Sequence, residues 1–289
     1  MEYFYASLLG IVQGITEFLP ISSSGHLILL HEALDFQVGS DLAFDVALHA
    51  GTLCAIIIYF AKDIIQYFQR GRKFLLAVLI SCVPAGLIGL VLGDLIDAYA
   101  RSSWVVVVML ATVAGVFFVV EKYYRPHLTL DTINWKHAFL IGCAQVLSLI
   151  PGTSRSGITM SAGMGLGLNR EAAARFSFIM TIPLLFAVIG QQGLAIMEEE
   201  LTRHDYLVMG VGTVVSAVIG AIVIRYLLVF LRRNSLKPFA WYRLGLALVV
   251  SLMLLLETET ICMSLFGLAV WVRDYGPFLV TPNQNNFTR

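Results

Sequence analysis

Six apolar stretches constrain this chain more than any other feature of its sequence. They are 44–61, 74–92, 104–120, 176–197, 206–224 and 244–256, and the last is expected to begin a few residues earlier. A membrane-spanning helix needs roughly 20 mostly apolar residues, whereas barrel strands would show short alternating segments. Only 13% of the residues are charged, against about 25% in a soluble domain. The sequence therefore predicts an all-α polytopic membrane protein with six transmembrane helices.

The basic residues are unevenly divided between the connecting segments. Connectors 62–73, 121–137, 169–175 and 225–243 hold 14 Lys and Arg, and the intervening loops hold two, Arg101 and Arg203. The positive-inside rule then places the four basic connectors in the cytoplasm. Lys+Arg and Asp+Glu are 19 each, so no net charge suggests a nucleic acid as partner.

Small residues in the second apolar stretch predict where helices approach closely. Gly86, Gly89 and Gly93 follow one another at short intervals there, and glycines in membrane helices let neighbouring backbones come near.

Two polar segments interrupt the apolar pattern, and they resemble each other. GIVQGITEFLPISSSG (10–25) and GCAQVLSLIPGTSRSG (142–157) align with a one-residue gap, pairing Gly10 with Gly142, Gln13 with Gln145, Pro20 with Pro151 and Ser23 with Ser154. Each is followed by three spans, and an odd number of spans turns the second copy upside down. We expect an inverted-topology repeat with two re-entrant helical hairpins. The repeats cover 1–137 and 138–257, and 258–289 is an extension without an assigned role.

Each motif also has a purely structural interpretation. The serines after Pro20 can cap a helix, the glutamines can join helices, and Arg155 can reach towards the interface. His26 alone is more often structural than catalytic.

Together, however, the motifs describe one polar cavity, because irregular backbone at membrane depth is tolerated only where it lines such a cavity. The cavity would hold the cation Arg155, the carboxylate Glu17, the imidazole of His26 and five serine hydroxyls. Arginine matches phosphate oxygens, helix N-termini bind anions, and serine with histidine is a minimal activated nucleophile. Glu17 can orient the histidine or hold a hard divalent cation. The set fits phosphoryl transfer on a lipid substrate.

QGITEFLPISSSGHL (13–27) and PGTSRSGITM (151–160) resemble the motifs of the undecaprenyl-diphosphate phosphatase family, membrane enzymes linked to bacitracin resistance. The resemblance covers about residues 1–257. It implies removal of the terminal phosphate of undecaprenyl diphosphate, which yields the lipid carrier for cell-wall polymers. It also implies a divalent cation, with Mg²⁺ and Ca²⁺ both open, and a place in the bacterial inner membrane with the site facing the periplasm. The partners would be the polyprenyl diphosphate and membrane lipids; a homodimer is left open.

The resemblance also assigns roles by motif position. Glu17, Ser23, His26 and Arg155 would form the catalytic core, with Arg155 clamping the diphosphate. Ser23 would be the nucleophile and His26 its base or orienter, although these two roles can be exchanged. Glu17 would bind the metal or His26. Substrate contacts would come from Gln13, Ser22, Ser24, Gln145, Ser154, Ser156 and Thr159.

Some features leave alternatives open. Many family members have glutamate at the position of Gln13, so a paired-carboxylate metal site is in doubt here and Glu17 is the main protein carboxylate. Asp45 and His49 either handle cations or protons at the cavity mouth or form a buried structural pair. Ile261 to Val272 is too short to cross a bilayer. The rival functions are a transporter that flips the lipid monophosphate in the same cavity and a structural scaffold.

Overall fold

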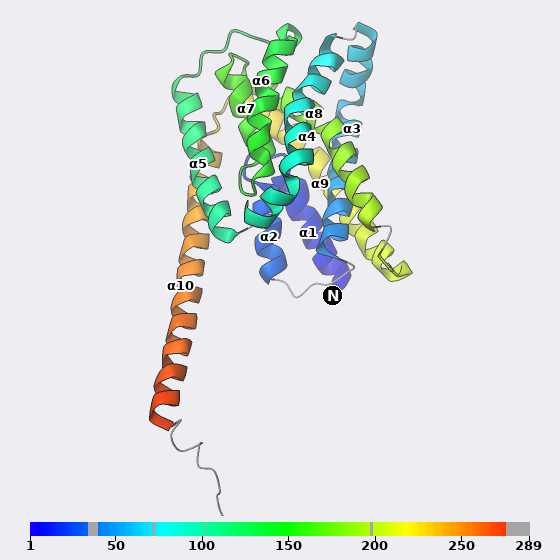
Figure 1. The fold of residues 1–289 in the computed structure, drawn as a ribbon. Coiled ribbons are helices and arrows are strands. Elements are labelled where there is room, and N and C mark those ends of the chain that lie inside the picture. The colour runs from blue at the N-terminus through cyan, green and yellow to red at the C-terminus, as the bar shows by residue number, and fades with distance from the viewer. Residues whose placement is uncertain (34–39, 71–72, 101, 197–198, 276–289) are drawn as a thin grey trace, which may run out of the picture. The chain divides into compact units, whose positions relative to one another are not determined.

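The computed structural model describes residues 1–33, 40–70, 73–100, 102–196 and 199–275 and is helical almost throughout (Figure 1). Within these ranges the extended structure is one isolated bridge between Leu128 and Leu168, so the predicted all-α class is confirmed. The helices are α1 Glu2–Thr16, α2 Ser23–Ala33, α3 Asp41–Arg70, α4 Lys73–Ala100, α5 Ser103–Lys122, η1 Leu130–Thr132, α6 Trp135–Gln145, η2 Val146–Leu149, α7 Arg155–Gly165, α8 Arg170–Ile196, α9 Arg203–Leu231 and α10 Lys237–Tyr275.

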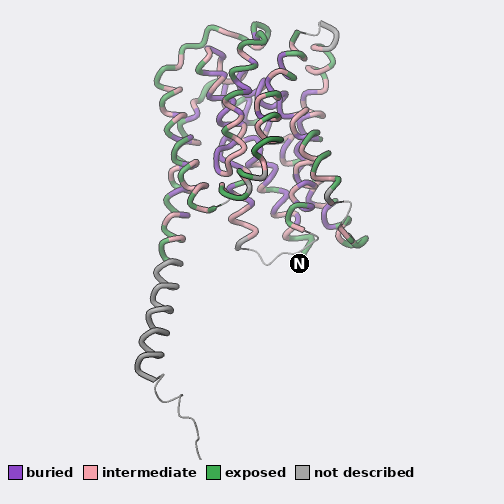
Figure 2. Tube along the Cα trace, viewed as in Figure 1, coloured by how far each residue is buried: buried purple, intermediate pink, exposed green. Residues whose placement is uncertain are grey.

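Six of these helices are long and apolar enough to cross a membrane, as predicted. They are α3, α4, α5, α8, α9 and the Lys237–Leu256 part of α10. Their outward faces are apolar: Leu90 and Val91 on α4 are each 76% exposed. Figure 2 shows exposed residues along the outer sides of these helices and buried residues between them. Exposed apolar surface of this extent is unusual in water and fits a lipid surrounding.

Several predicted helix ends are wrong. Residues 94–100, which lie beyond the apolar stretch 74–92, are also helical, because α4 continues to Ala100. The basic connector 169–175 belongs to α8, which begins at Arg170. Residues 261–272, predicted as a separate short apolar segment, are part of the single helix α10. Polar residues at the ends of these helices keep helical geometry, so hydropathy marks the apolar part of each helix and not its full length.

The two interrupted segments form helical hairpins that turn back. The second hairpin is closed at its ends, because the segment before α6 bonds to the segment after α7. The backbone N–H groups of His127 and Leu128 both donate to the carbonyl of Gly167. In the first hairpin, Leu27 of α2 shares an apolar cluster with Ala6 and Leu9 of α1. In Figure 1 the ends of the first hairpin lie at the lower end of the helices α1 to α9, and the loop into α6 lies at their upper end. This arrangement suits the predicted re-entrant hairpins; their insertion in the bilayer and the repeat itself stay predictions.

The two hairpin tips share one local geometry. Ser22 precedes α2 with φ +78°, and Ser154 precedes α7 with φ +71°. The amide of Gly25 donates to Ser22 Oγ at 3.3 Å, and the amide of Gly157 donates to Ser154 Oγ at 3.2 Å. The tips therefore match when Ser22 is paired with Ser154, without a gap, and the predicted pairing of Ser23 with Ser154 is one residue out of register. In the matched register Ser23 corresponds to Arg155.

Glycines in α1 and α6 allow the hairpins to pack tightly. A Cβ atom on Gly10 would lie 2.7 Å from the carbonyl oxygen of Gly212 in α9, and one on Gly142 would lie 2.4 Å from that of Ser81 in α4. The glycines of α4 that were predicted to allow close helix packing do not lie at such contacts. Among the described residues, nothing lies within 4 Å of a Cβ on Gly86 or Gly93, and one on Gly89 would make one ordinary contact. Apolar composition alone does not tell which face of a helix meets protein and which meets lipid.

Replacing Gly142 with alanine is expected to destabilise the protein by about 1–3 kcal/mol, because α6 and α4 must move apart to admit the methyl group. The measurement is thermal unfolding in detergent. Gly115→Ala in α5 is the matched control, since nothing lies within 4 Å of a Cβ at that position. Equal melting temperatures for the two variants would contradict the expected clash.

Candidate active site

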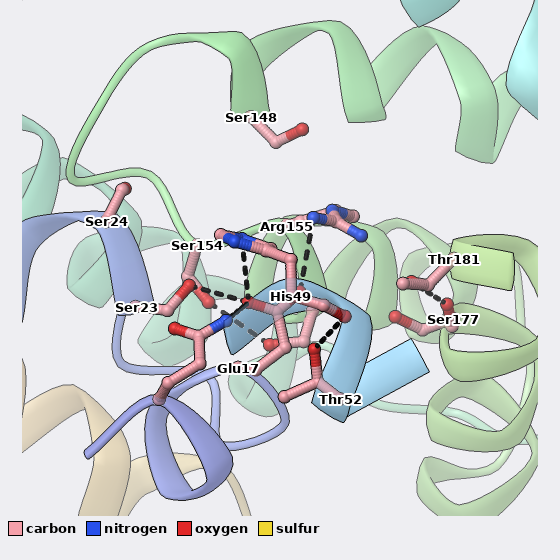
Figure 3. Close-up of polar contacts among 12 residues, drawn as sticks. Glu17, Ser23, Ser24, His49, Thr52, Ser148, Ser154, Arg155, Ser177 and Thr181 are labelled. Atoms are coloured by element: carbon pink, nitrogen blue, oxygen red, sulfur yellow. Dashed lines mark hydrogen bonds and ion pairs between the residues drawn. The ribbon is translucent and has the colours of Figure 1, made fainter. Parts of the chain in front are cut away.

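Glu17 lies at the centre of the site, directly after α1, and is buried. Its Oε2 accepts a hydrogen bond from the Ser23 hydroxyl at 2.8 Å and another from Gln13 Nε2 at 3.1 Å. Its Oε1 lies 3.2 Å from Arg155 Nη2. Figure 3 shows Ser23, His49 and Arg155 gathered around this carboxylate. The structure thus brings together three of the four predicted catalytic residues, Glu17, Ser23 and Arg155, in one cluster.

Ser23 and Arg155 each occupy the first position of a helix, α2 and α7 respectively. Helix N-termini carry partial positive charge and unpaired amides, which favours an anion beside them. Arg155 adds a full charge, and its buried Nη1 has no hydrogen-bond partner within the described residues. A buried donor without a partner is costly, so this nitrogen is available to a phosphate oxygen. A hydroxyl bonded to a carboxylate therefore lies beside an anion-binding arginine.

His26 has other partners than those predicted. Its Nδ1 lies 2.7 Å from the carbonyl oxygen of Ser22, and its Nε2 lies 2.8 Å from the hydroxyl of Tyr242 in α10. Because a carbonyl only accepts, Nδ1 carries the proton and Nε2 accepts from tyrosine. Both ring nitrogens are thus occupied, and the hydrogen bonds of the described residues join His26 to neither Ser23 nor Glu17. The Ser23 hydroxyl donates its hydrogen bond to the Glu17 carboxylate instead.

His49 of α3 is a site residue whose role the sequence left open. Its Nε2 lies 3.8 Å from Glu17 Oε2, and its Nδ1 bonds to the carbonyl oxygen of Asp45 at 2.7 Å. His49 therefore does not pair with the Asp45 side chain, as the structural alternative required, but faces the Glu17 carboxylate. The spacing in FDVALHAGT pointed to this histidine, and only the fold shows which group it meets.

A cavity of 530 Å³ opens beside these residues. It is lined by Ser24, Leu27, Ile28, His31, Asp41, Leu42, Asp45, His49, Ser148, Leu149, Pro151, Val188 and Gln192. Ser24 is the predicted substrate-binding serine that lines it, and its side chain is exposed. The size suits a small anionic head group.

The other residues predicted to contact substrate lie in or next to the two hairpin tips, and their hydroxyl groups bond to the protein itself. Ser22 and Ser154 cap their helices, and Ser156 donates to the carbonyl of Leu19 in the other hairpin at 3.3 Å. Thr159 bonds to the Arg155 carbonyl and to Ser177 Oγ at 2.6 Å. The amide of Gln145 is buried, with neither atom bonded among the described residues. The contact of Ser156 with Leu19 joins the two tips, and the contact of Thr159 with Ser177 joins α7, which begins at Arg155, to α8.

The residues around Glu17 include oxygen atoms of the kind that divalent cations bind. In the described part of the chain, no three His, Cys, Asp or Glu side chains are grouped as a metal site. However, Gln13 Oε1 is buried there without a partner, beside the Glu17 carboxylate. Magnesium commonly takes one or two protein oxygens and completes its shell with waters and substrate phosphates. These two oxygens fit a cation whose other ligands are waters and phosphate oxygens.

His31 at the end of α2 joins the start of α3. Its Nε2 lies 3.1 Å from Asp45 Oδ1, and its Nδ1 lies 3.4 Å from Asp41 Oδ1. The hydrogen bond with Asp45 raises the pKa of His31; burial opposes the rise, and the charges of both aspartates add to it. Since the folded pKa is raised, the stabilisation is complete below the ordinary value of about 6.5 and is lost as pH rises through the raised pKa.

We expect the melting temperature of the native protein to fall more than that of His31→Gln between about pH 6 and about pH 9, because only the native chain loses this interaction on deprotonation. Thermal unfolding of both proteins at a series of pH values tests this. Parallel pH curves for the two would show that the His31 pairing adds nothing to stability.

Comparison with known proteins adds an independent line of information. The family model described as bacitracin resistance protein BacA matches residues 6–249. An undecaprenyl-diphosphatase of Rubrobacter xylanophilus is 41% identical over 271 residues, covering 89% of this chain and all of that protein. Undecaprenyl-diphosphatases of Trichlorobacter lovleyi and Thermodesulfovibrio yellowstonii are 39% and 40% identical, covering 88% and 87% of this chain and 98% and 97% of those proteins.

Proposed function

Because this chain belongs to the bacitracin resistance protein BacA family, we propose that it hydrolyses undecaprenyl diphosphate to undecaprenyl phosphate and inorganic phosphate. The match to the family model and to these relatives confirms the family assignment made from the two motifs. The chain is a membrane phosphatase, and its product is the lipid carrier used for cell-wall polymers. The names of these relatives give the transporter alternative no support.

The observation that carries a hydrolytic mechanism is the Ser23–Glu17 hydrogen bond of 2.8 Å beside Arg155. Transport of a phosphate head group needs only binding, whereas hydrolysis needs a nucleophile and a group that takes its proton. The ion pair with Arg155 favours the charged form of Glu17. A carboxylate in that form is able to accept the serine proton.

In the first step, Ser23 Oγ attacks the terminal phosphorus while its proton passes to Glu17. The bond from that phosphorus to the bridging oxygen breaks, and the electron pair leaves with undecaprenyl phosphate. In the second step, water attacks the phosphoserine and its two protons stay with the phosphate, while Oγ leaves and recovers the proton from Glu17, so that inorganic phosphate is released. Arg155 binds the phosphoryl oxygens in both steps, where positioning and charge neutralisation dominate catalysis.

His26 is the other nucleophile that the sequence left open. Its hydrogen bonds to the Ser22 carbonyl and Tyr242 occupy both ring nitrogens, so an attack by His26 first requires one of them to break. Ser23 needs no such change, and this favours serine as the nucleophile with His26 as a residue that supports the tip of the first hairpin.

A divalent cation, when bound with the substrate, would neutralise phosphate charge. Glu17 and the unpartnered Gln13 Oε1 are the protein groups that would hold it. Because so few protein oxygens are available, we expect binding to be weak without substrate. A chelator should therefore abolish phosphate release within the mixing time, and added Mg²⁺ or Ca²⁺ should restore it fully. An unchanged rate in the presence of excess EDTA would exclude a cation requirement.

The function itself is tested by measuring inorganic phosphate released from undecaprenyl diphosphate by the purified protein in detergent. Sustained turnover is expected for the native chain. A protein that binds undecaprenyl phosphate but releases no phosphate from the diphosphate would instead act as a carrier.

The orientation of the site follows from the basic connectors. With these in the cytoplasm, the first hairpin enters from the outer side and the second from the inner side. The site then faces the periplasm of a bacterial inner membrane. Labelling of a cysteine introduced at exposed Ser24 by a membrane-impermeant reagent in intact spheroplasts should succeed; labelling only after lysis would reverse the assignment.

A further inference from the structure

Arg243 in α10 is a fully buried arginine that bonds only to backbone carbonyls in the hydrogen bonds of the described residues. The sequence pattern placed it in a cytoplasmic connector, which is wrong, because α10 begins at Lys237. Its guanidinium donates to Leu110 O at 3.2 Å, Pro20 O at 3.3 Å, Met109 O at 3.1 Å, Gly152 O at 2.8 Å and Thr153 O at 3.1 Å. Burying a cation without a carboxylate is costly, and these bonds offset the cost.

The carbonyls come from both hairpin tips. Pro20 belongs to the turn before α2, and Gly152 and Thr153 belong to the turn before α7. One planar side chain thus bonds directly to the two loops that carry Ser23 and Arg155. Met109 and Leu110 anchor the same guanidinium to α5, and its carbon lies 5.7 Å from the centre of the Phe117 ring. Five bonds to three segments leave the guanidinium a single orientation.

Both tips need such support because each contains a strained residue. Ser22 and Ser154 have positive φ angles, which non-glycine residues rarely adopt. Strain of this kind persists only where the surroundings hold the backbone in place. Arg243 bonds to Pro20, two residues before Ser22, and to Gly152 and Thr153, the two residues before Ser154. Its neighbour Tyr242 bonds to His26 at 2.8 Å, so α10 contacts the site through two adjacent side chains.

We propose that Arg243 is a positioning residue that fixes the two hairpin tips relative to each other, so that Ser23 and Arg155 act on one phosphoryl group. The proposal rests on the proposed function. Displacement of a reacting group by about 1 Å can lower a rate by about 10²-fold. Arg243 therefore controls the rate without touching the substrate.

The test compares Arg243→Lys and Arg243→Ala with the native protein. Lysine keeps the charge but offers three donors on one nitrogen instead of five in a fixed plane, so it holds the two tips less rigidly. We therefore expect kcat to fall by about 10- to 100-fold with a smaller change in KM. Arg243→Ala should lose more activity and regain part of it when methylguanidinium is added. Arg232→Ala is the matched control, because Arg232 is exposed and pairs with Glu171; its rate should be near native and insensitive to methylguanidinium.

The outcomes separate the two proposals. If the native protein releases no phosphate, the proposed function fails before any variant is compared. If the native protein is active, the positioning role is overturned by a native kcat in Arg243→Lys or by absence of rescue in Arg243→Ala. It is also overturned if activity falls only in proportion to the folded fraction measured by thermal unfolding, or if neither variant folds, since Arg243 would then serve the fold as a whole.

Discussion

Ser23→Ala is expected to lower the rate of phosphate release by about 10⁴-fold or more, as removal of a serine nucleophile does in other hydrolases. The reason is geometric: Ser23 Oγ is the hydroxyl that donates to Glu17, at 2.8 Å, and its loss removes both the attacking atom and the proton that the carboxylate takes. Binding of the lipid should change little, because Arg155 and the helix N-termini remain.

The measurement is initial phosphate release from undecaprenyl diphosphate, together with binding of undecaprenyl phosphate to the same variant. Ser24→Ala is the matched control. Ser24 is the next residue in the same helix turn and lines the cavity, but its hydroxyl is not bonded to Glu17, so a loss below about tenfold is expected. If Ser23→Ala kept more than a tenth of the native rate, serine would not be the nucleophile and His26 would have to be reconsidered.

The membrane helices could be predicted from sequence because the bilayer imposes a length. Each span needs an uninterrupted apolar stretch, and all six stretches became helices. Their ends could not be predicted in the same way. Charged residues occur in the segments Asp94 to Ala100 and Arg170 to Arg175, yet both segments are helical and extend α4 and α8. A helix makes its hydrogen bonds within its own backbone, so it can continue from the lipid into water.

The meeting of Glu17, Ser23 and Arg155 could also be predicted, because two similar interrupted segments suggested two hairpins at one cavity. The partners of each side chain could not. His26 is three residues from Ser23 in the same helix, but its ring is held by Tyr242, which follows 216 residues later. His49 and Arg243 come from helices whose contacts depend on tertiary packing. The spacing of residues along a helix predicts which side chains share a face. It does not predict which side chain of another helix each of them contacts.

Arg155→Ala is expected to lower kcat/KM by about 10³-fold, the smaller end of the effect of a transition-state arginine in phosphoryl transfer. Arg155 Nη2 pairs with Glu17, and its Nη1 is buried without a partner in the described residues. The same side chain can therefore contact Glu17 through one nitrogen and a phosphoryl oxygen of the substrate through the other. Unlike Ser23→Ala, this variant should lose lipid phosphate binding as well as turnover.

Arg155→Lys separates charge from shape in the same experiment. A lysine supplies the charge but not two nitrogens in a fixed plane, so it should restore binding more than it restores kcat. Arg175→Lys serves as the control, because Arg175 pairs with Asp63 of α3 and Glu171 of α8 and has no ion pair with Glu17 among the described residues. It should leave kcat/KM within a few fold of native. If Arg155→Lys matched the native kcat, the guanidinium would be needed only for charge. The planar contact with two phosphoryl oxygens would then play no part in the transition state.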